Sequence, residues 1–188
     1  MQNIILIGMP GAGKSTLGVL LAKALAYDFV DTDVVMQVQK AMLLQDILDT
    51  YGVEGFLQIE EQCLTTLHVQ RSVVATGGSV VYSPAIMRHL QSLGTIVYLQ
   101  LTLEELMPRL DNLDRRGVVI RDDQSFADVY AERVPLYEHY ANITVPSGGE
   151  HHEPIVAEIV ARMQKEELRT HLTQIHDTPP STGSGYGL

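Results

Sequence analysis

The residues with the clearest chemical meaning form the run Gly8-Met9-Pro10-Gly11-Ala12-Gly13-Lys14-Ser15, followed by Thr16. The run fits the phosphate-binding pattern G-x-x-x-x-G-K-[ST] at every fixed position. Glycines allow such a loop to curl around a phosphate, the lysine can reach the β and γ oxygens, and the serine hydroxyl can ligate Mg²⁺. The alternative is a glycine-rich turn that binds nothing. An apolar run precedes the pattern and helical spacing follows it, so we expect a nucleoside triphosphate to bind Gly11, Ala12, Gly13, Lys14, Ser15 and Thr16.

Two carboxylates, Asp31 and Asp33, come at the end of the next short apolar run. Phosphoryl transfer needs a metal ion that bridges the phosphates and a group that orients the attacking hydroxyl. Asp31 could hold Mg²⁺ directly or through water, and Asp33 could accept the proton. The alternative is that both residues only cap a helix that begins at Val34. We favour the catalytic interpretation because the phosphate-binding pattern lies nearby.

Arginines are the third group of candidates, because guanidinium groups stabilise the negative charge that spreads in a phosphoryl-transfer transition state. Arg115, Arg116 and Arg121 lie in or beside the polar, weakly periodic segment 111–125, which we interpret as a mobile loop. A loop of this kind could act as a lid that brings one arginine to the phosphates. Most surface arginines have no such role, so we expect it of at least one member of this set but not of each.

Weaker signals come from glycine, histidine and cysteine. Gly77 and Gly78 follow a strand-like run, where the absence of Cβ allows a ligand to approach the backbone, although such pairs are more often simple turns. His151 and His152 lack the further spaced ligands of a metal site, so we interpret them as residues of a loop and a helix start. Cys63 lies among leucines in a helical pattern and is expected in the core.

Alternating elements must position these residues. Short β-branched runs predict strands at 3–7, 29–31, 72–76, 95–99 and 143–145. Helical spacing predicts helices at 17–25, 34–38, 43–48, 53–67, 84–93, 102–110, 126–140 and 154–168.

This alternation predicts parallel βαβ units in an α/β fold, with a sheet covered by helices on both faces. In such folds ligands bind beyond the carboxyl ends of the strands, so the glycines and aspartates described above should meet in one crevice. The apolar stripe 42–48 is interpreted as packing, although helices after Asp33 could also roof the substrate site. We expect one domain over residues 1–170 and a disordered tail over 171–188, which is rich in Pro, Ser and Gly from Asp177 on.

Composition limits the possible partners. The chain of 188 residues has a net charge of −10, from 13 basic and 23 acidic residues, and no basic stripe that would indicate nucleic-acid binding. No secretory leader or apolar run of membrane-spanning length is visible, and the one cysteine cannot form an internal disulfide. We therefore expect a soluble, cytoplasmic, monomeric protein that acts on a small molecule, with no nucleic-acid or membrane partner.

Taken together, these motifs resemble the shikimate kinases over about residues 3–163. The phosphate-binding run is shared by many unrelated nucleoside triphosphatases, but the resemblance also includes Asp31-Thr32-Asp33, Phe56 followed by Glu60, Thr76-Gly77-Gly78 and Arg133-Val134-Pro135-Leu136-Tyr137. It implies a three-layer P-loop NTPase fold with a five-stranded parallel sheet, a substrate-binding helical region at about 34–65 and a lid at about 111–125. It also implies that ATP and Mg²⁺ are used to phosphorylate a hydroxyl.

The resemblance implies roles for individual residues. Lys14 would bind phosphates, Ser15 and Asp31 would lie at the metal, and Asp33 would bind substrate hydroxyls and act as the base. Arg109 would lie on the adenine side of the nucleotide, and Arg116 would be the lid arginine that stabilises the transition state. Gly77 and Gly78 would bind the substrate, and Arg133 would bind the substrate carboxylate.

Two departures bear on the substrate. The family has Phe-Arg-x-x-Glu, in which the arginine forks the substrate carboxylate, but this sequence has Leu57 at that position, and Gln58 lies about 100° further around the helix. Ser79 replaces the third glycine of the family's Gly-Gly-Gly. Shikimate is still our leading acceptor, because the phosphoryl-transfer residues and Arg133 match the family pattern. The alternatives are a kinase of the same fold for another small hydroxylated metabolite and a nucleotide-binding regulator without catalysis.

Overall fold

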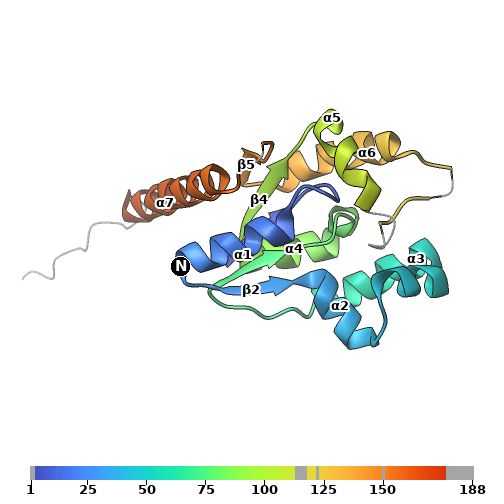
Figure 1. The fold of residues 1–188 in the computed structure, drawn as a ribbon. Helices are drawn as coiled ribbons and strands as arrows, with labels where there is room; N and C mark the ends of the chain where they lie inside the picture. Colours follow the sequence, from blue (N-terminus) through green and yellow to red (C-terminus); the bar gives the residue numbers. More distant parts are fainter. Residues whose placement is uncertain (1–2, 113–117, 122, 150, 177–188) are drawn as a thin grey trace, which may run out of the picture.

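A computed structural model describes the backbone of residues 3–112, 118–121, 123–149 and 151–176 (Figure 1). The predicted lid arginines Arg115 and Arg116 and the tail from residue 177 lie outside these residues. No helix in the described part of the chain is both long enough and apolar enough to span a membrane. Cys63 is buried with a free thiol, as expected.

The centre of the molecule is a five-stranded sheet in the order β2-β3-β1-β4-β5, and every neighbouring pair of strands is parallel. The strands are β1 (Asn3–Ile7), β2 (Asp28–Asp31), β3 (Ser72–Ala75), β4 (Gly94–Gln100) and β5 (Ile143–Pro146). All residues of β1 are buried, as a central parallel strand covered on both faces requires. The α/β fold class predicted from the alternation is confirmed.

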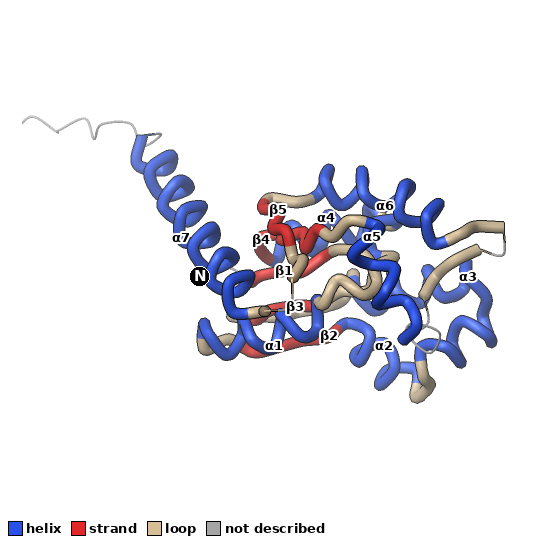
Figure 2. Tube along the Cα trace, turned by 45° about the horizontal axis from the view of Figure 1, so that its top comes forward, coloured by secondary structure: helices blue, strands red, loops and turns tan. Residues whose placement is uncertain are grey.

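Helices cover the sheet on both sides (Figure 2). They are α1 (Lys14–Leu25), α2 (Thr32–Lys40), α3 (Leu44–Leu64), α4 (Pro84–Leu93), α5 (Leu103–Leu106), α6 (Phe126–Tyr140) and α7 (Glu153–His176), with short 3₁₀ turns η1 (Val80–Tyr82) and η2 (Met107–Asn112). Helix α1 packs against α7, whereas α4 and α6 both contact η1 and β4. Helices α2 and α3 extend beyond the carboxyl end of β2, where they can form one wall of a site (Figures 1 and 2).

Several helix boundaries differ from the prediction for identifiable reasons. Helix α2 begins at Thr32, two residues early, because the Asp31 carboxylate caps it by accepting a hydrogen bond from the Asp33 amide at 3.0 Å. The helix predicted over 102–110 begins with a capping box formed by Thr102 and Glu105 but becomes 3₁₀ from Met107 on. Pro108 explains the change because it lacks the N–H that an α-helix would need there.

The other differences concern α3 and α7. Helix α3 is broken at Gly52, which has φ 67° and ψ −179°, at the junction where the sequence predicted a break. It ends at Leu64 rather than near residue 67. Helix α7 continues to His176, beyond the predicted end near residue 168, so residues 171–176 of the expected tail are helical.

Candidate active site

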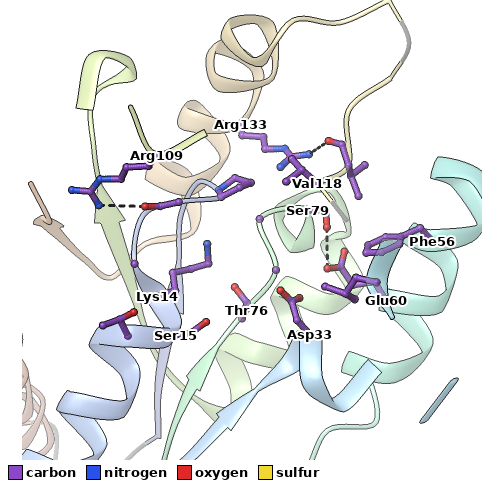
Figure 3. A pocket seen from close by; sticks show the side chains of 18 of the residues that line it. Lys14, Ser15, Asp33, Phe56, Glu60, Thr76, Ser79, Arg109, Val118 and Arg133 are labelled. Atoms are coloured by element: carbon purple, nitrogen blue, oxygen red, sulfur yellow. Dashed lines mark hydrogen bonds between the residues drawn. The ribbon is translucent and has the colours of Figure 1, made fainter. Parts of the chain in front are cut away.

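A cavity of about 420 Å³ opens beyond the carboxyl ends of the central strands (Figure 3). It contains most of the site residues predicted from the sequence, together with several that were not predicted. Its lining consists of Pro10, Gly11, Gly13, Lys14, Ser15, Thr16, Asp33, Leu44, Phe56, Glu60, Thr76, Gly77, Gly78, Ser79, Pro108, Arg109, Val118, Val119, Arg133 and His152.

The phosphate loop forms the floor of this cavity. Gly11 and Gly13 have φ values of 83° and 85°, a left-handed conformation that glycine adopts without strain. At the start of the loop, a Cβ on Gly8 would lie 2.7 Å from the Leu99 carbonyl oxygen, so only glycine fits. Ala12 faces the core, with 1% of its surface exposed, and its amide donates to the Met9 carbonyl at 3.1 Å. The curled loop is therefore built into the sheet edge.

Lys14 is the cation at the centre of the loop. Its ammonium group is buried and donates to the carbonyl oxygens of Gly8 at 2.7 Å and Met9 at 2.9 Å. Burial lowers the pKa of Lys14 to about 8, although Asp33 opposes the shift. A phosphate group that enters the loop would replace these weak carbonyl partners with a full negative charge.

Ser15 and Asp31 form an oxygen-rich pair beside the loop. The Ser15 hydroxyl donates to Asp31 Oδ2 at 2.7 Å, while Asp31 Oδ1 caps α2. The capping and catalytic interpretations of Asp31 are thus compatible, since one carboxylate makes both contacts. Hydroxyl and carboxylate oxygens suit a hard cation such as Mg²⁺. Among the described residues, no group of three or more His, Cys, Asp or Glu side chains is arranged to hold a metal ion, so an ion here would depend on phosphate and water ligands as well.

Asp33 points into the cavity from the first turn of α2 (Figure 3). Burial, with a further contribution from the Asp31 charge, raises the pKa of Asp33 to about 6, and Lys14 opposes the shift. The carboxylate is therefore ionised near neutral pH and remains a better proton acceptor than an exposed aspartate. These are the properties of a general base.

Gly77 and Gly78 lie where a side chain would be crowded by neighbouring atoms. A Cβ on Gly77 would lie 2.7 Å from Glu60 Oε1 and 3.0 Å from Asp33 Oδ1. A Cβ on Gly78 would lie 2.8 Å from Pro10 Cδ and 3.1 Å from an Arg133 guanidinium nitrogen. Both glycines therefore line the cavity at positions where a side chain would collide with neighbouring side chains.

Two of the arginines singled out in the sequence line the cavity. Arg133, with 1% of its surface exposed, donates to the Tyr82 hydroxyl at 3.0 Å and to the Val119 carbonyl at 2.6 Å. Arg109 lies on the opposite side and donates to the Gly11 carbonyl at 3.3 Å (Figure 3). Arg121, by contrast, is exposed and pairs with Glu54 at 3.7 Å outside the cavity.

Glu60 and His152 line the cavity although residue chemistry alone gave them no role. Glu60 is 2% exposed and accepts a hydrogen bond at Oε1 from the Ser79 hydroxyl at 2.9 Å. Its Oε2 is buried without a hydrogen-bond partner. Burial raises the pKa of Glu60 to about 7, and the Ser79 hydrogen bond opposes the shift. Glu60 belongs to the Phe56 and Glu60 pair of the family resemblance, but no signal in the sequence indicated that its carboxylate is buried, and His152 had been interpreted as a residue of a helix start.

Comparison with known proteins agrees with this geometry. The family model described as shikimate kinase matches residues 10–164. A shikimate kinase of Francisella tularensis is 34% identical over 171 residues, which cover 89% of this chain and 97% of that protein.

Two solved structures have the same fold over most of this chain. Shikimate kinase from Acinetobacter baumannii, in complex with shikimate, has a TM-score of 0.81 at 26% identity and covers 89% of this chain and 96% of its own. Shikimate kinase from Aquifex aeolicus has a TM-score of 0.76 at 28% identity, with coverages of 88% and 98%. With its phosphate loop, acidic residues and buried arginine in one cavity, the chain belongs to the shikimate kinase family.

Proposed function

We propose that this protein transfers the γ-phosphoryl group of ATP to a hydroxyl of shikimate. The observation that carries the proposal is the convergence of the Lys14 ammonium, the Asp33 carboxylate and the Arg133 guanidinium on one cavity. A phosphate-binding cation, a proton acceptor and a cation for a substrate carboxylate are the groups that this reaction needs. Family membership supplies the substrate class.

The phosphate side of the cavity would bind the nucleotide. Loop amides from Gly11 to Thr16 and the Lys14 ammonium would hold the phosphates, supported by the positive end of α1. Arg109, which donates a hydrogen bond to the Gly11 carbonyl of this loop, would contact the base of the nucleotide. His152 lines the same cavity from the segment before α7.

The acceptor side would hold the small alcohol. Asp33 would accept a hydrogen bond from the attacking hydroxyl and take its proton as the bond to phosphorus forms. Arg133 would bind the carboxylate of the acceptor, because its guanidinium group is buried and borders Gly78. The amides of Gly77 and Gly78 would bring the backbone close to the same molecule.

Ser15 and Asp31 would hold Mg²⁺. These two oxygens would hold the ion beside the loop, and its positive charge would offset the negative charge that develops on the phosphates. Before the ion binds, the Ser15–Asp31 hydrogen bond keeps both oxygens at the side of the loop where the phosphates are expected. Arg116 and the rest of the segment 111–125 would act as the lid, and one chain would form a complete site as a monomer.

A substrate panel tests the proposal directly. Purified protein with ATP and Mg²⁺ is incubated with shikimate and with other small polyols and hydroxy acids, and ADP formation and the phosphorylated product are measured. We expect shikimate to be the best acceptor. Another acceptor with a higher kcat/KM would reassign the substrate, and ATP binding without transfer to any acceptor would indicate a regulator instead of an enzyme.

A further inference from the structure

The buried carboxylate of Glu60 has one oxygen that the protein does not use. Glu60 Oε1 accepts from Ser79, but Oε2 has no hydrogen-bond partner, although the side chain is only 2% exposed and lines the cavity. An unpaired buried oxygen of an ionisable group is costly, so a native structure that keeps one usually has a use for it. The position of Oε2 in the cavity makes a ligand the natural partner.

The neighbours of Glu60 explain why no side chain fills this role. Residue 57, one turn earlier on α3, is leucine and has no donor. The guanidinium of Arg133 makes its hydrogen bonds to Tyr82 and Val119. The other charged groups that act on Glu60 are Lys14, which is bonded to backbone carbonyls, and Asp33, which is an acceptor when ionised.

The two carboxylates lie on the same side of the cavity (Figure 3). A Cβ placed on Gly77 would lie 2.7 Å from Glu60 Oε1 and 3.0 Å from Asp33 Oδ1. The two carboxylate oxygens are therefore no more than about 6 Å apart. This spacing suits a small ring that presents one hydroxyl to Asp33 and another to Glu60. The Ser79 hydroxyl holds the Glu60 carboxylate in place, because its hydrogen bond is buried.

We propose that Glu60 is a specificity-determining residue whose free carboxylate oxygen accepts a hydrogen bond from an acceptor hydroxyl other than the one that is phosphorylated. The inference rests on the proposed function and extends it: the preferred acceptor is a polyol with a second hydroxyl within reach of Glu60. Ser79, which replaces a glycine of the family pattern, is the positioning residue for this contact.

The test compares Glu60→Met with Glu61→Met. Methionine keeps the length of the side chain and removes both oxygens, and Glu61 is an exposed neighbour that contacts Ser83. KM, kcat and calorimetric affinity are measured with shikimate and with analogues that each lack one of the hydroxyls that are not phosphorylated. A hydrogen bond to a charged group predicts that Glu60→Met raises the KM for shikimate about 10- to 100-fold, with kcat within about threefold.

The analogues separate contact from general damage. For the analogue that lacks the contacted hydroxyl, Glu60→Met should cause no further loss, whereas Glu61→Met should behave like the wild type with every acceptor. Ser79→Ala should give a smaller loss of the same pattern, because it removes the hydrogen bond that holds the Glu60 carboxylate in place. This variant also provides the test if Glu60→Met does not fold.

Each remaining outcome contradicts the inference. If Glu60→Met loses the same factor with every analogue, the residue acts only through the shape of the site, and an unchanged KM rules out the contact altogether. If the wild type neither binds nor phosphorylates shikimate, the proposed function fails first and the inference fails with it. If the wild type phosphorylates shikimate and Glu60→Met has the same KM for it, the inference about Glu60 is wrong and the proposed function stands.

Discussion

At the scale of single residues, the site depends on two buried charges whose pKa values move toward each other. Burial raises the pKa of Asp33 to about 6 and lowers that of Lys14 to about 8. Each group opposes the shift of the other, because an opposite charge nearby favours the ionised form. Between these values both groups are ionised, which is the state that a base and a phosphate-binding cation require.

This pair predicts a bell-shaped dependence of kcat/KM on pH. Asp33 must have lost its proton to act as the base, so activity should fall as the pH drops below about 6. Lys14 must keep its proton to bind phosphate, so activity should also fall as the pH rises above about 8. Steady-state kinetics from pH 5 to about 9.5 measure both limbs, since kcat/KM reports the free enzyme.

Asp33→Asn checks the assignment of the base. The change should lower kcat about 10²- to 10⁴-fold, the usual contribution of a general base, while the affinity for ATP stays within a fewfold of the wild type. Asp28→Asn is the matched control, because Asp28 is an exposed aspartate at the other end of β2. An Asp33→Asn enzyme that keeps its kcat would show that another group takes the proton.

Sequence patterns identified the residues whose chemistry is local. Lys14 and Ser15 belong to a continuous motif, and Asp33 and Gly78 follow strands that end at the same edge of the sheet. The unpaired oxygen of Glu60 was not predictable in this way, because it depends on how α3 packs under the loop after β3. Packing between distant segments determines which polar groups find partners, and no local pattern records it.

At the scale of elements, the break in α3 positions one wall of the cavity. Gly52 has φ 67° and ψ −179°, a conformation that is open essentially to glycine alone. Phe56 lies one turn after Gly52 and Glu60 two turns after it, and both line the cavity from the second half of α3. The orientation of these side chains therefore depends on a backbone conformation four residues away from the first of them.

Gly52→Ala should consequently impair both stability and binding. No atom lies within 4 Å of a Cβ at this position, so the cost is conformational rather than steric. We expect the free energy of unfolding to fall by about 1–3 kcal/mol and the KM for the acceptor to rise, with urea denaturation and kinetics as the measurements. Thr50→Ala, at an exposed position in the same helix, should change stability by less than about 0.5 kcal/mol. Equal effects of the two changes would mean that the break is not required.

Helix ends were predictable where a cap marks them. Ser83 caps α4, Ser125 caps α6, and the capping box of Thr102 begins α5, each at the predicted residue or next to it. The extension of α7 to His176 was not predicted, although Leu168, Leu172 and Ile175 continue the helical spacing of apolar residues to the end of the helix. No cap or glycine marks a helix end near residue 168, so the predicted end there had no local signal behind it.

At the scale of the whole molecule, the sequence predicted five strands and their parallel direction but not their neighbours. The order β2-β3-β1-β4-β5 places β1 between β3 and β4, so the phosphate loop lies in the middle of the sheet edge. Strands that are adjacent in the chain, such as β1 and β2, are separated by β3. This order follows from the crossovers and the packing of the helices, which a list of apolar runs does not contain.

The buried charges should also shape the stability of the fold. The pKa values of Asp33 and Glu60 are raised to about 6 and 7, so the folded protein holds protons that the unfolded chain has already lost between about pH 4 and 7. Stability attributable to these groups therefore falls as the pH rises through this range. The pKa of Lys14 is lowered to about 8, so its contribution rises with pH between about 8 and 10.5.

Glu60→Gln isolates one part of this dependence. Without the carboxylate, the decrease in stability between pH 5.5 and 7.5 should shrink, and at pH 7.5 the variant should be more stable than the wild type by roughly 1–3 kcal/mol. Urea midpoints in the absence of nucleotide measure the difference, and Glu61→Gln should follow the wild type. A Glu60→Gln protein that is less stable at pH 7.5 would indicate that the carboxylate supports the fold.

Nucleotide binding should stabilise the folded molecule through the phosphate loop. At an ATP concentration about 100 times the Kd, with Mg²⁺ present, binding adds about 2.7 kcal/mol to the free energy of unfolding, which for a chain of this size raises Tm by roughly 5–10 °C.

Lys14→Met should remove most of this shift while leaving the Tm of the free protein unchanged or higher, because a buried charge has been removed. Lys23→Met, at an exposed position on the same helix, should keep the full shift. Differential scanning fluorimetry across an ATP titration measures all three proteins. A wild type that does not respond to ATP, or a Lys14→Met protein that responds as strongly as the wild type, would mean that the triphosphate binds elsewhere or not at all.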